Sequence, residues 1–240
     1  MESIETRTSM ADSRQRIADN LAAVEKRLSA ACRRAGRARS EVTLVAVTKT
    51  VSTEVAALLP ELGVHHLGES RPQELWRKAA VVTNVHWHLI GHLQRNKIER
   101  SLPLIECIHS VDSLRLLEAL EQACRQASRT LDALLEVNAS REETKHGFTP
   151  EDVSGLATKL AVLKYVRIEG LMTMAAYEED PERTRPTFAA LRKLRDQLAT
   201  ELGRPLPHLS MGMSNDFEIA VEEGATLVRL GTILFEGIEG

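Results

Sequence analysis

One lysine interrupts an otherwise apolar segment near the start of this 240-residue chain. The stretch LVAVTKT, residues 44–50, begins with four apolar residues and carries Lys49 between two threonines. Such a run is typical of a strand buried on both faces, where an ammonium group is unfavourable unless it has a task or a route to water. In partly desolvated surroundings an amine has a lowered pKa and can form a Schiff base with an aldehyde. Lys49 is therefore a candidate covalent ligand, and the alternative is a side chain that only extends to solvent.

Two glycine-containing segments near the end of the chain could bind an anion. The first, SMGMSND, offers Ser210, Gly212 and Ser214 directly before a predicted helix, so backbone N–H groups and hydroxyls can turn towards a phosphate. The second, LGT, offers Gly231 and Thr232 in the same way. The alternative is that the two serines only shape a turn and cap a helix. Because both segments carry this chemistry, we predict a phosphate site there.

Arg229 lies within the apolar run TLVRLG, where a buried guanidinium needs an acceptor. An arginine that faces a pyridine nitrogen is one way to tune pyridoxal 5′-phosphate (PLP), and it leaves that nitrogen neutral because arginine cannot accept a proton. Together with Lys49 and the two phosphate segments, Arg229 predicts a phosphorylated aldehyde cofactor held at both ends. Such a site favours mild chemistry or none.

The elements that would position these residues alternate along the chain. Apolar side chains at alternating steps of four and three predict a helix from about residue 12 to 35, ended by Gly36. Strands are predicted at 42–48, 64–67, 85–90, 104–109, 131–138, 166–172, 207–210 and 226–231. Helices are predicted near 53–62, 71–81, 92–100, 112–128, 150–163, 182–202 and 214–223, with N-cap residues such as Ser113 and Thr149. Residues 1–11 are predicted to be a flexible tail and residues 12–240 a single PLP-binding domain.

Repeated strand–helix units imply a parallel sheet, and their number and length predict a single (β/α)8 barrel of the TIM type with an extra N-terminal helix. The rival is an open doubly wound sheet, which is disfavoured because the first strand lacks the GxGxxG turn of many nucleotide-binding versions. In a barrel, functional residues lie at the C-terminal ends of the strands, and the loops after strands seven and eight recurrently bind phosphate. This topology would place Lys49 at the mouth, with the phosphate site on the far side.

Composition argues against several classes of function. A net charge of −3 and an aromatic content of 3% give neither the basic nor the stacking surface of a nucleic-acid-binding protein. No apolar run approaches the roughly 18 residues of a membrane span and no signal-peptide core is present, so we expect a cytoplasmic protein without membrane contact. The three cysteines are dispersed, which favours reduced thiols. His86, His88 and His92 lack an accompanying carboxylate or cysteine, so no metal site is predicted.

Longer stretches resemble the YggS/PROSC-type PLP homeostasis proteins, a family of PLP-binding single-domain barrels. The similarity extends from about residue 42 to 235 through LVAVTKT, HLGES, WHLIGHLQRNK, IHSVDS, EVNASREETKHGF, GLMTM and LSMGMSNDFEIAVEEGATLVRLGT. The resemblance implies a fold like the N-terminal barrel of alanine racemase, with Lys49 as the internal-aldimine lysine and Arg229 near the ring nitrogen. It also implies phosphate contacts from Ser210, Ser214, Gly231 and Thr232.

The resemblance further implies a protein that binds PLP and hands it on, with PLP-dependent apoenzymes as recipients and no established catalytic turnover or catalytic residue. We expect a monomer rather than a dimer. The alternative is a PLP-dependent amino-acid racemase, which needs a second acid or base opposite the lysine. In the racemases a tyrosine of a separate β domain has that role, whereas this chain ends at Gly240 and only Tyr177 could approach the cofactor. The chain also has GESRPQE where relatives often have GENYVQE, so the asparagine contact falls to Ser70 or is lost.

Overall fold

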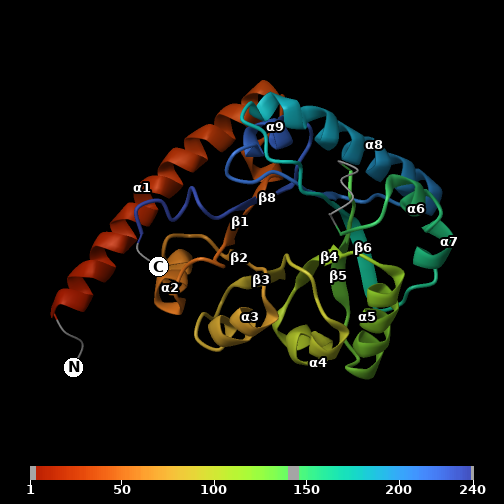
Figure 1. Cartoon of the computed structure of the whole chain (residues 1–240), viewed down its shortest axis with the longest axis horizontal. Helices are drawn as coiled ribbons and strands as arrows, with labels where there is room; N and C mark the ends of the chain where they lie inside the picture. The colour runs from red at the N-terminus through yellow and green to blue at the C-terminus, as the bar shows by residue number, and fades with distance from the viewer. Residues whose placement is uncertain (1–3, 140–145, 239–240) are drawn as a thin grey trace.

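Eight parallel strands form a closed barrel in the order β1 to β8. Figure 1 labels strands β1 to β6 and β8 of this barrel. The computed structural model describes residues 4–139 and 146–238. The strands are β1 (Thr43–Val47), β2 (His66–Glu69), β3 (His86–Leu89), β4 (Cys107–Val111), β5 (Leu131–Glu136), β6 (Val166–Met172), β7 (His208–Ser210) and β8 (Leu227–Leu230). Each overlaps a predicted strand, so the prediction of a TIM-type barrel is confirmed. The largest shift is at β4, which starts later than predicted because Pro103 belongs to a 3-10 turn.

Helices surround the barrel, and the long N-terminal helix lies along its outside against α9 and α2 (Figure 1). They are α1 (Ile4–Arg34), α2 (Thr53–Glu61), α3 (Pro72–Ala79), α4 (Ile98–Ser101), α5 (Leu114–Gln126), α6 (Pro150–Ser154), α7 (Ala157–Leu160), α8 (Arg185–Leu202) and α9 (Phe217–Glu222). Ser113 and Thr149 are N-caps as predicted, since each side chain accepts a hydrogen bond from a backbone N–H three residues later.

Three helical predictions need correction. The N-terminal helix begins at Ile4 and not near residue 12, and neither proline nor glycine interrupts residues 4–11. Residues 1–3 of the predicted tail lie outside the described residues. The segment 92–100 contains only a 3-10 turn, Arg95–Lys97, before the short α4. The segment 150–163 divides at Gly155 into α6 and α7. The remainder of the predicted element order is observed.

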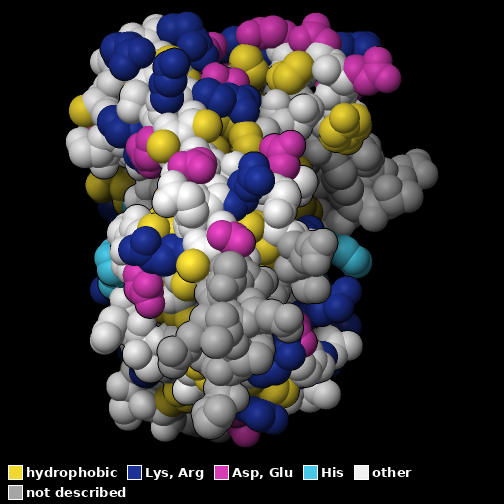
Figure 2. All heavy atoms as spheres, turned by 90° about the vertical axis from the view of Figure 1, so that its left-hand side faces the viewer, with side chains coloured by type: hydrophobic (Ala, Val, Ile, Leu, Met, Phe, Trp, Pro, Cys, Tyr) yellow, Lys and Arg dark blue, Asp and Glu magenta, His cyan; other side chains and the backbone are white. Residues whose placement is uncertain are grey.

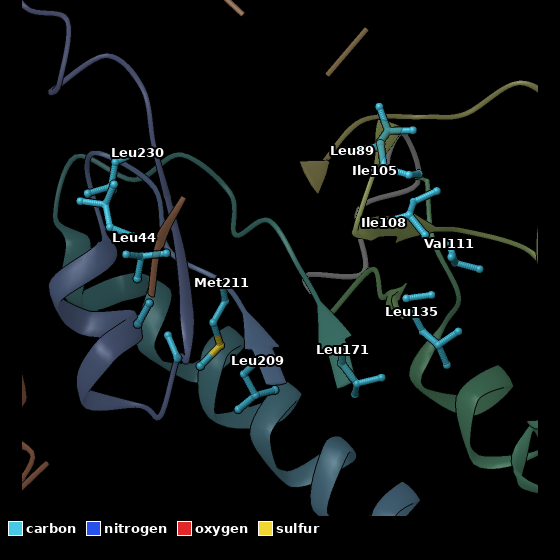
Figure 3. Packing of buried hydrophobic residues seen from close by; sticks show 14 of the residues in the cluster. Leu44, Leu89, Ile105, Ile108, Val111, Leu135, Leu171, Leu209, Met211 and Leu230 are labelled. Atoms are coloured by element: carbon cyan, nitrogen blue, oxygen red, sulfur yellow. The ribbon is translucent and has the colours of Figure 1, made fainter. Parts of the chain in front are cut away.

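Apolar packing occurs in two layers. The larger layer lies between strands and helices and includes Leu44 of β1 and Leu230 of β8, which Figure 3 shows beside each other. The smaller layer lies inside the barrel and consists of Val45, Cys107, Leu134, Met172 and Leu227. TIM-barrel interiors are usually filled by layers of bulky apolar residues. The small interior cluster of this barrel leaves room for buried polar side chains.

The surface carries both signs of charge. On the face in Figure 2, which is the left-hand side of Figure 1, basic and acidic side chains are interspersed over the coloured part of the molecule. This pattern agrees with the formal net charge of −3. Among the helices that the structure describes, none has both the length and the apolar character needed to cross a membrane.

Candidate functional site

Lys49 lies in the turn directly after β1, at the C-terminal mouth of the barrel, and is exposed. Strand β1 is hydrogen-bonded to β8 with Val45 opposite Arg229, so the turn that carries Lys49 is next to the loop after β8. The sequence analysis placed the phosphate segments on the far side of the mouth, and this part of the prediction is wrong. In a closed barrel the first and last strands are neighbours, which brings the candidate amine and the candidate phosphate loops to one part of the rim.

A fully buried ion pair holds the backbone immediately before Lys49. The ammonium of Lys78 donates to Oε1 of Glu69 at 2.6 Å and to the carbonyl oxygen of Thr48 at 2.5 Å. The hydroxyl of Thr48 donates to the same carboxylate oxygen at 2.7 Å, and neither charged side chain has any exposed surface. The backbone N–H of Ser70 donates to the second oxygen of Glu69 at 3.2 Å. Because these bonds fix the carbonyl of Thr48, they limit where the next residue, Lys49, can place its side chain.

The loop after β7 needs a glycine at its centre. Gly212 has φ +93°, and a Cβ atom there would lie 2.6 Å from the side chain of Ala220 and 2.9 Å from the backbone of Phe217. Only glycine combines that backbone conformation with such a close approach. The backbone N–H of Arg229 donates to the carbonyl oxygen of Gly212 at 3.0 Å, which ties the loop to β8.

Ser214 connects the two candidate phosphate loops instead of capping a helix. Its Oγ accepts a hydrogen bond from the backbone N–H of Ile233 at 3.3 Å, and α9 begins only at Phe217. Thr232 is exposed at the rim, and Gly231 passes so close to β1 that an added Cβ would lie 3.1 Å from the carbonyl oxygen of Val47. The structure therefore brings Ser214, Gly231 and Thr232 together, next to the turn that carries Lys49.

Ser210 lies apart from those rim groups. It is fully buried at the end of β7, its Oγ accepts from Nη1 of Arg229 at 2.5 Å, and it lies 2.8 Å from Nδ1 of His109. Its hydroxyl thus has two partners inside the barrel. A role in holding Arg229 accounts for this position, whereas direct phosphate binding remains a prediction.

Arg229 projects into the barrel interior and is only 4% exposed. Its Nη2 donates to the carbonyl oxygen of Thr173 at 2.9 Å, in addition to the bond from Nη1 to Ser210. Burial lowers the pKa of the guanidinium to about 10, and the carboxyl groups of Asp216 and Glu136 oppose this shift. Even with this pKa the group is a cation at neutral pH, fixed at two points below the mouth.

Two buried carboxyl groups face this cation. Glu136 ends β5, and burial followed by the charge of Asp112 raises its pKa, while Arg229 acts in the opposite direction. Burial also raises the pKa of Asp216, whose Oδ1 accepts from the backbone N–H of Met213 at 2.7 Å. Both groups therefore keep a proton to higher pH than ordinary carboxyls, which suits a site that exchanges protons with a ligand.

The histidines have different partners from those expected. His86 pairs with Glu106 at 2.6 Å and the exposed His92 with Asp112 at 2.7 Å, so both have the carboxylate that the sequence analysis did not find. His88 lies inside the barrel near Cys107 and His109, and the candidate ligand atoms of these three residues lie within 4.8 Å of one another.

This interior cluster is better explained by hydrogen bonding than by a metal. Nδ1 of His88 and Nε2 of His109 are 2.9 Å apart, so a shared proton already occupies the space between them. Burial also raises the pKa of the Cys107 thiol, which disfavours the thiolate that metals bind.

Lys78 and Glu136 were not identified from the sequence, and Glu69 and His109 were recognised only as polar residues at strand ends, without a role. Lys78 sits in a polar helix and looks like a surface residue, since no local pattern shows that its side chain crosses to Glu69. Glu69 and Glu136 each end a strand, which is the position where barrel enzymes carry functional groups. That position was a usable signal, but it could not show that these carboxyls are buried.

A scan against family profiles matches residues 20–238 to the N-terminal domain of alanine racemase. Curated relatives include the pyridoxal phosphate homeostasis protein of Aquifex aeolicus, 42% identical over 90% of this chain and 96% of the relative. The pyridoxal phosphate homeostasis protein of Pseudomonas aeruginosa is 36% identical over 91% of this chain and 94% of its own length. The matches therefore span nearly the whole of both proteins.

Solved structures of similar fold include a relative with PLP bound and an alanine racemase. PipY of Synechococcus elongatus, solved with PLP bound, superimposes with a TM-score of 0.80 and 32% identity over 91% of this chain and 99% of that one. Alanine racemase of Corynebacterium glutamicum gives a TM-score of 0.70 at 19% identity, covering 94% of this chain but 63% of the racemase. The second likeness shows the shared barrel fold alone.

Proposed function

Since this chain belongs to the family of the alanine racemase N-terminal domain, and within it to the pyridoxal phosphate homeostasis proteins, we propose that it binds PLP at the barrel mouth and contributes to PLP homeostasis. When bound, PLP supplies an aldehyde carbon that condenses with a primary amine and releases water. Lys49 provides the amine. The observation that carries the proposal is that Lys49, in the turn after β1, is adjacent to the polar loops after β7 and β8.

The residues of the mouth fit the parts of this cofactor. The hydroxyls of Ser214 and Thr232 and the close-packed backbone at Gly212 and Gly231 form a rim suited to a phosphate. Arg229 presents a fixed cation below that rim, where it can donate to a ring nitrogen but cannot protonate it. A ring bound in this way withdraws electrons weakly, which supports storage of the cofactor rather than catalysis.

Replacement of Lys49 tests the covalent attachment. Purified protein should carry a near-ultraviolet or visible absorption band from bound PLP, and borohydride should fix the cofactor to a peptide that contains Lys49. Lys49→Ala should lose this adduct, and Lys49→Arg, which keeps the charge, should lose it as well. Lys26→Ala, at an exposed position of α1, is the matched control and should behave as the wild type. A full stoichiometric adduct in Lys49→Ala would refute the assignment.

We further propose that the protein transfers PLP to apoenzymes and has no catalytic turnover of its own. Of the two tyrosines, Tyr177 is 83% exposed and Tyr165 precedes β6 at the opposite end of the barrel, so neither is held over the mouth as a second acid or base. The test is incubation of PLP-loaded protein with D- and L-alanine in deuterated water. We expect no rapid exchange at Cα, together with transfer of PLP to an added apoenzyme. Rapid exchange with turnover would favour the racemase alternative.

A further inference from the structure

A line of polar side chains crosses the barrel interior from its N-terminal face to Arg229. Nδ1 of His66 lies 3.0 Å from Nε2 of His88, and Nδ1 of His88 lies 2.9 Å from Nε2 of His109. Nδ1 of His109 lies 2.8 Å from Oγ of Ser210, which accepts from Arg229. The three histidines, which we term the histidine column, come from the adjacent strands β2, β3 and β4. They replace part of the apolar packing that usually fills such a barrel.

The two inner members of the histidine column are neutral at physiological pH. His88 is 5% exposed and His109 is completely buried. Burial, reinforced by neighbouring histidines, lowers the pKa of His88 to about 3. Burial, then His88 and the cation of Arg229, lowers the pKa of His109 well below its ordinary value. A neutral imidazole has one N–H donor and one bare nitrogen acceptor, so each ring can donate only one hydrogen bond.

The arginine at the inner end sets the direction of these bonds. Arg229 can only donate, so Oγ of Ser210 accepts from it and has one proton left to give. Among the described residues, the other side-chain partner of that hydroxyl is Nδ1 of His109. His109 therefore carries its proton on Nε2 and donates to His88. By the same reasoning His88 carries its proton on Nε2 and donates to His66.

If the hydrogen bonds ran in the reverse direction, from the histidines to Ser210, the buried hydroxyl of Ser210 would have no acceptor for its proton. If His109 donated to Ser210, the serine oxygen would accept from both neighbours, and its own proton would have no side-chain acceptor among the described residues. Burial of an unpaired polar group is unfavourable, because the group loses its hydrogen bonds to water. In the described part of the chain no buried side-chain nitrogen or oxygen lacks a hydrogen-bond partner. Only one arrangement of protons satisfies every group in the line.

The outer end of the histidine column reaches solvent. His66 is half-buried, stacks on His86 with ring centroids 4.6 Å apart, and lines a cavity of about 350 Å3 at the N-terminal face. The terminal N–H on Nε2 of His66 thus has a route to water. The chain of hydrogen bonds is therefore accessible to solvent at His66 and buried at the guanidinium of Arg229.

We propose that the histidine column fixes the orientation of the Ser210 hydroxyl and thereby positions the guanidinium of Arg229 for a ligand at the barrel mouth. His66, His88 and His109 are positioning residues, since they act through Ser210 and do not touch the ligand. The consequence for PLP rests on the proposed function, whereas the arrangement of protons in the column is a property of the protein without ligand.

Nitrogen-15 NMR of the imidazoles in PLP-free protein tests the arrangement directly. We expect His88 and His109 each to be neutral and to carry the proton on Nε2. A proton on Nδ1 of either ring, or a charged ring at neutral pH, would overturn the proposal. This measurement does not depend on PLP, so it remains decisive even if the wild-type protein fails to bind the cofactor and the proposed function falls.

Substitutions at the outer end test the coupling without disturbing the mouth. His66→Leu removes the acceptor for His88 and should change the imidazole signals of His88 and His109 and the guanidinium signals of Arg229. His66→Asn places an amide oxygen near the position of Nδ1 and should restore them. His65→Gln, at an exposed neighbouring position outside the column, is the control and should change neither. Unchanged signals in folded His66→Leu would contradict a positioning role.

Substitution of Ser210 tests whether the hydrogen bond to Arg229 affects the binding of PLP. Ser210→Ala removes one acceptor from the guanidinium of Arg229, so we expect PLP to dissociate at least about tenfold more readily. The absorption band of bound PLP should shift, while borohydride still attaches it to Lys49. Ser210→Thr retains a hydroxyl and should recover most of the affinity. If Ser210→Ala binds PLP as the wild type does, with an unchanged band, Arg229 does not need this support.

Discussion

Lys49 and Lys78 show how surroundings give the same side chain different roles. Lys49 is exposed at the rim and free to meet a ligand, whereas Lys78 has no exposed surface and is bound to Glu69 and to the backbone of Thr48. A buried ion pair often contributes little net stability compared with apolar packing. Removal of one partner is nevertheless strongly destabilising, because the other charge stays buried without compensation.

We therefore expect Lys78→Met to lower the free energy of unfolding by about 3–5 kcal/mol, as measured by urea denaturation. Combining it with Glu69→Gln removes both charges and should restore much of the loss. Lys159→Met, at an exposed position, is the control and should change stability by less than about 0.5 kcal/mol. If the double variant were as unstable as Lys78→Met, the loss would come from packing and not from the unpaired carboxylate.

Helix α1 packs from outside against the segments that follow the two candidate phosphate loops. The guanidinium of Arg27 in this helix donates to Glu218 at 2.8 Å and lies 4.6 Å above the ring of Phe217. Arg27 therefore contacts the start of α9. Asn20 donates to the carbonyl oxygens of Leu234 and Glu236 after β8. The helix thus holds both segments that follow β7 and β8, although it stands outside the repeated strand–helix pattern.

Packing of α1 can be tested at Leu28, which is completely buried. Leu28→Ala leaves a cavity between helix and barrel and should reduce the free energy of unfolding by about 2–5 kcal/mol. Lys26→Ala lies on the exposed face of the same helix and should change it by less than about 0.5 kcal/mol. Chemical denaturation gives both values, and equal stabilities for the two variants would show that α1 is not part of the cooperative core.

For the whole molecule, the neutral histidines of the barrel interior make stability depend on pH. In the folded state the pKa of His88 is about 3, whereas an unfolded histidine has a pKa near 6.5. The unfolded state therefore binds protons first as the pH falls, and the stability present above about pH 6.5 is lost towards pH 3. The raised pKa values of Glu136 and Asp216 act in the opposite sense, because the folded state then takes up protons first.

The variant His88→Gln isolates the contribution of the His88 ring to the pH dependence of stability. Between pH 6.5 and 5 the free energy of unfolding should fall by about 1.4 kcal/mol per pH unit for each fully neutral histidine. His88→Gln should flatten the slope by about that amount, whereas His65→Gln, at an exposed position, should leave it unchanged. Urea denaturation at several pH values measures both. A slope in His88→Gln equal to that of the wild type would contradict the buried neutral ring.

Local sequence patterns were sufficient to predict the architecture, and they identified the candidate residues of the rim. Alternating strand and helix patterns specify a barrel, because apolar periodicity and turn residues act over a few positions at a time. Glycine placement in the loops is equally local, since Gly212 meets a backbone requirement that can be recognised from the turn. Lys49, Ser214, Gly231 and Thr232 all end or follow strands, which a barrel places at one mouth.

The contacts between buried polar groups could not be predicted in the same way, because they depend on the folded barrel. Lys78 reaches Glu69 and Thr48 from helix α3, and Ser210 meets His109 across 101 positions of sequence. Pairs of this kind depend on how side chains from different elements cross the interior, which leaves no periodic trace in the chain. The sequence thus identified the groups that could bind a phosphorylated aldehyde. The fold determined how the arginine below them is held, because a buried donor must find its acceptor wherever the closed barrel provides one.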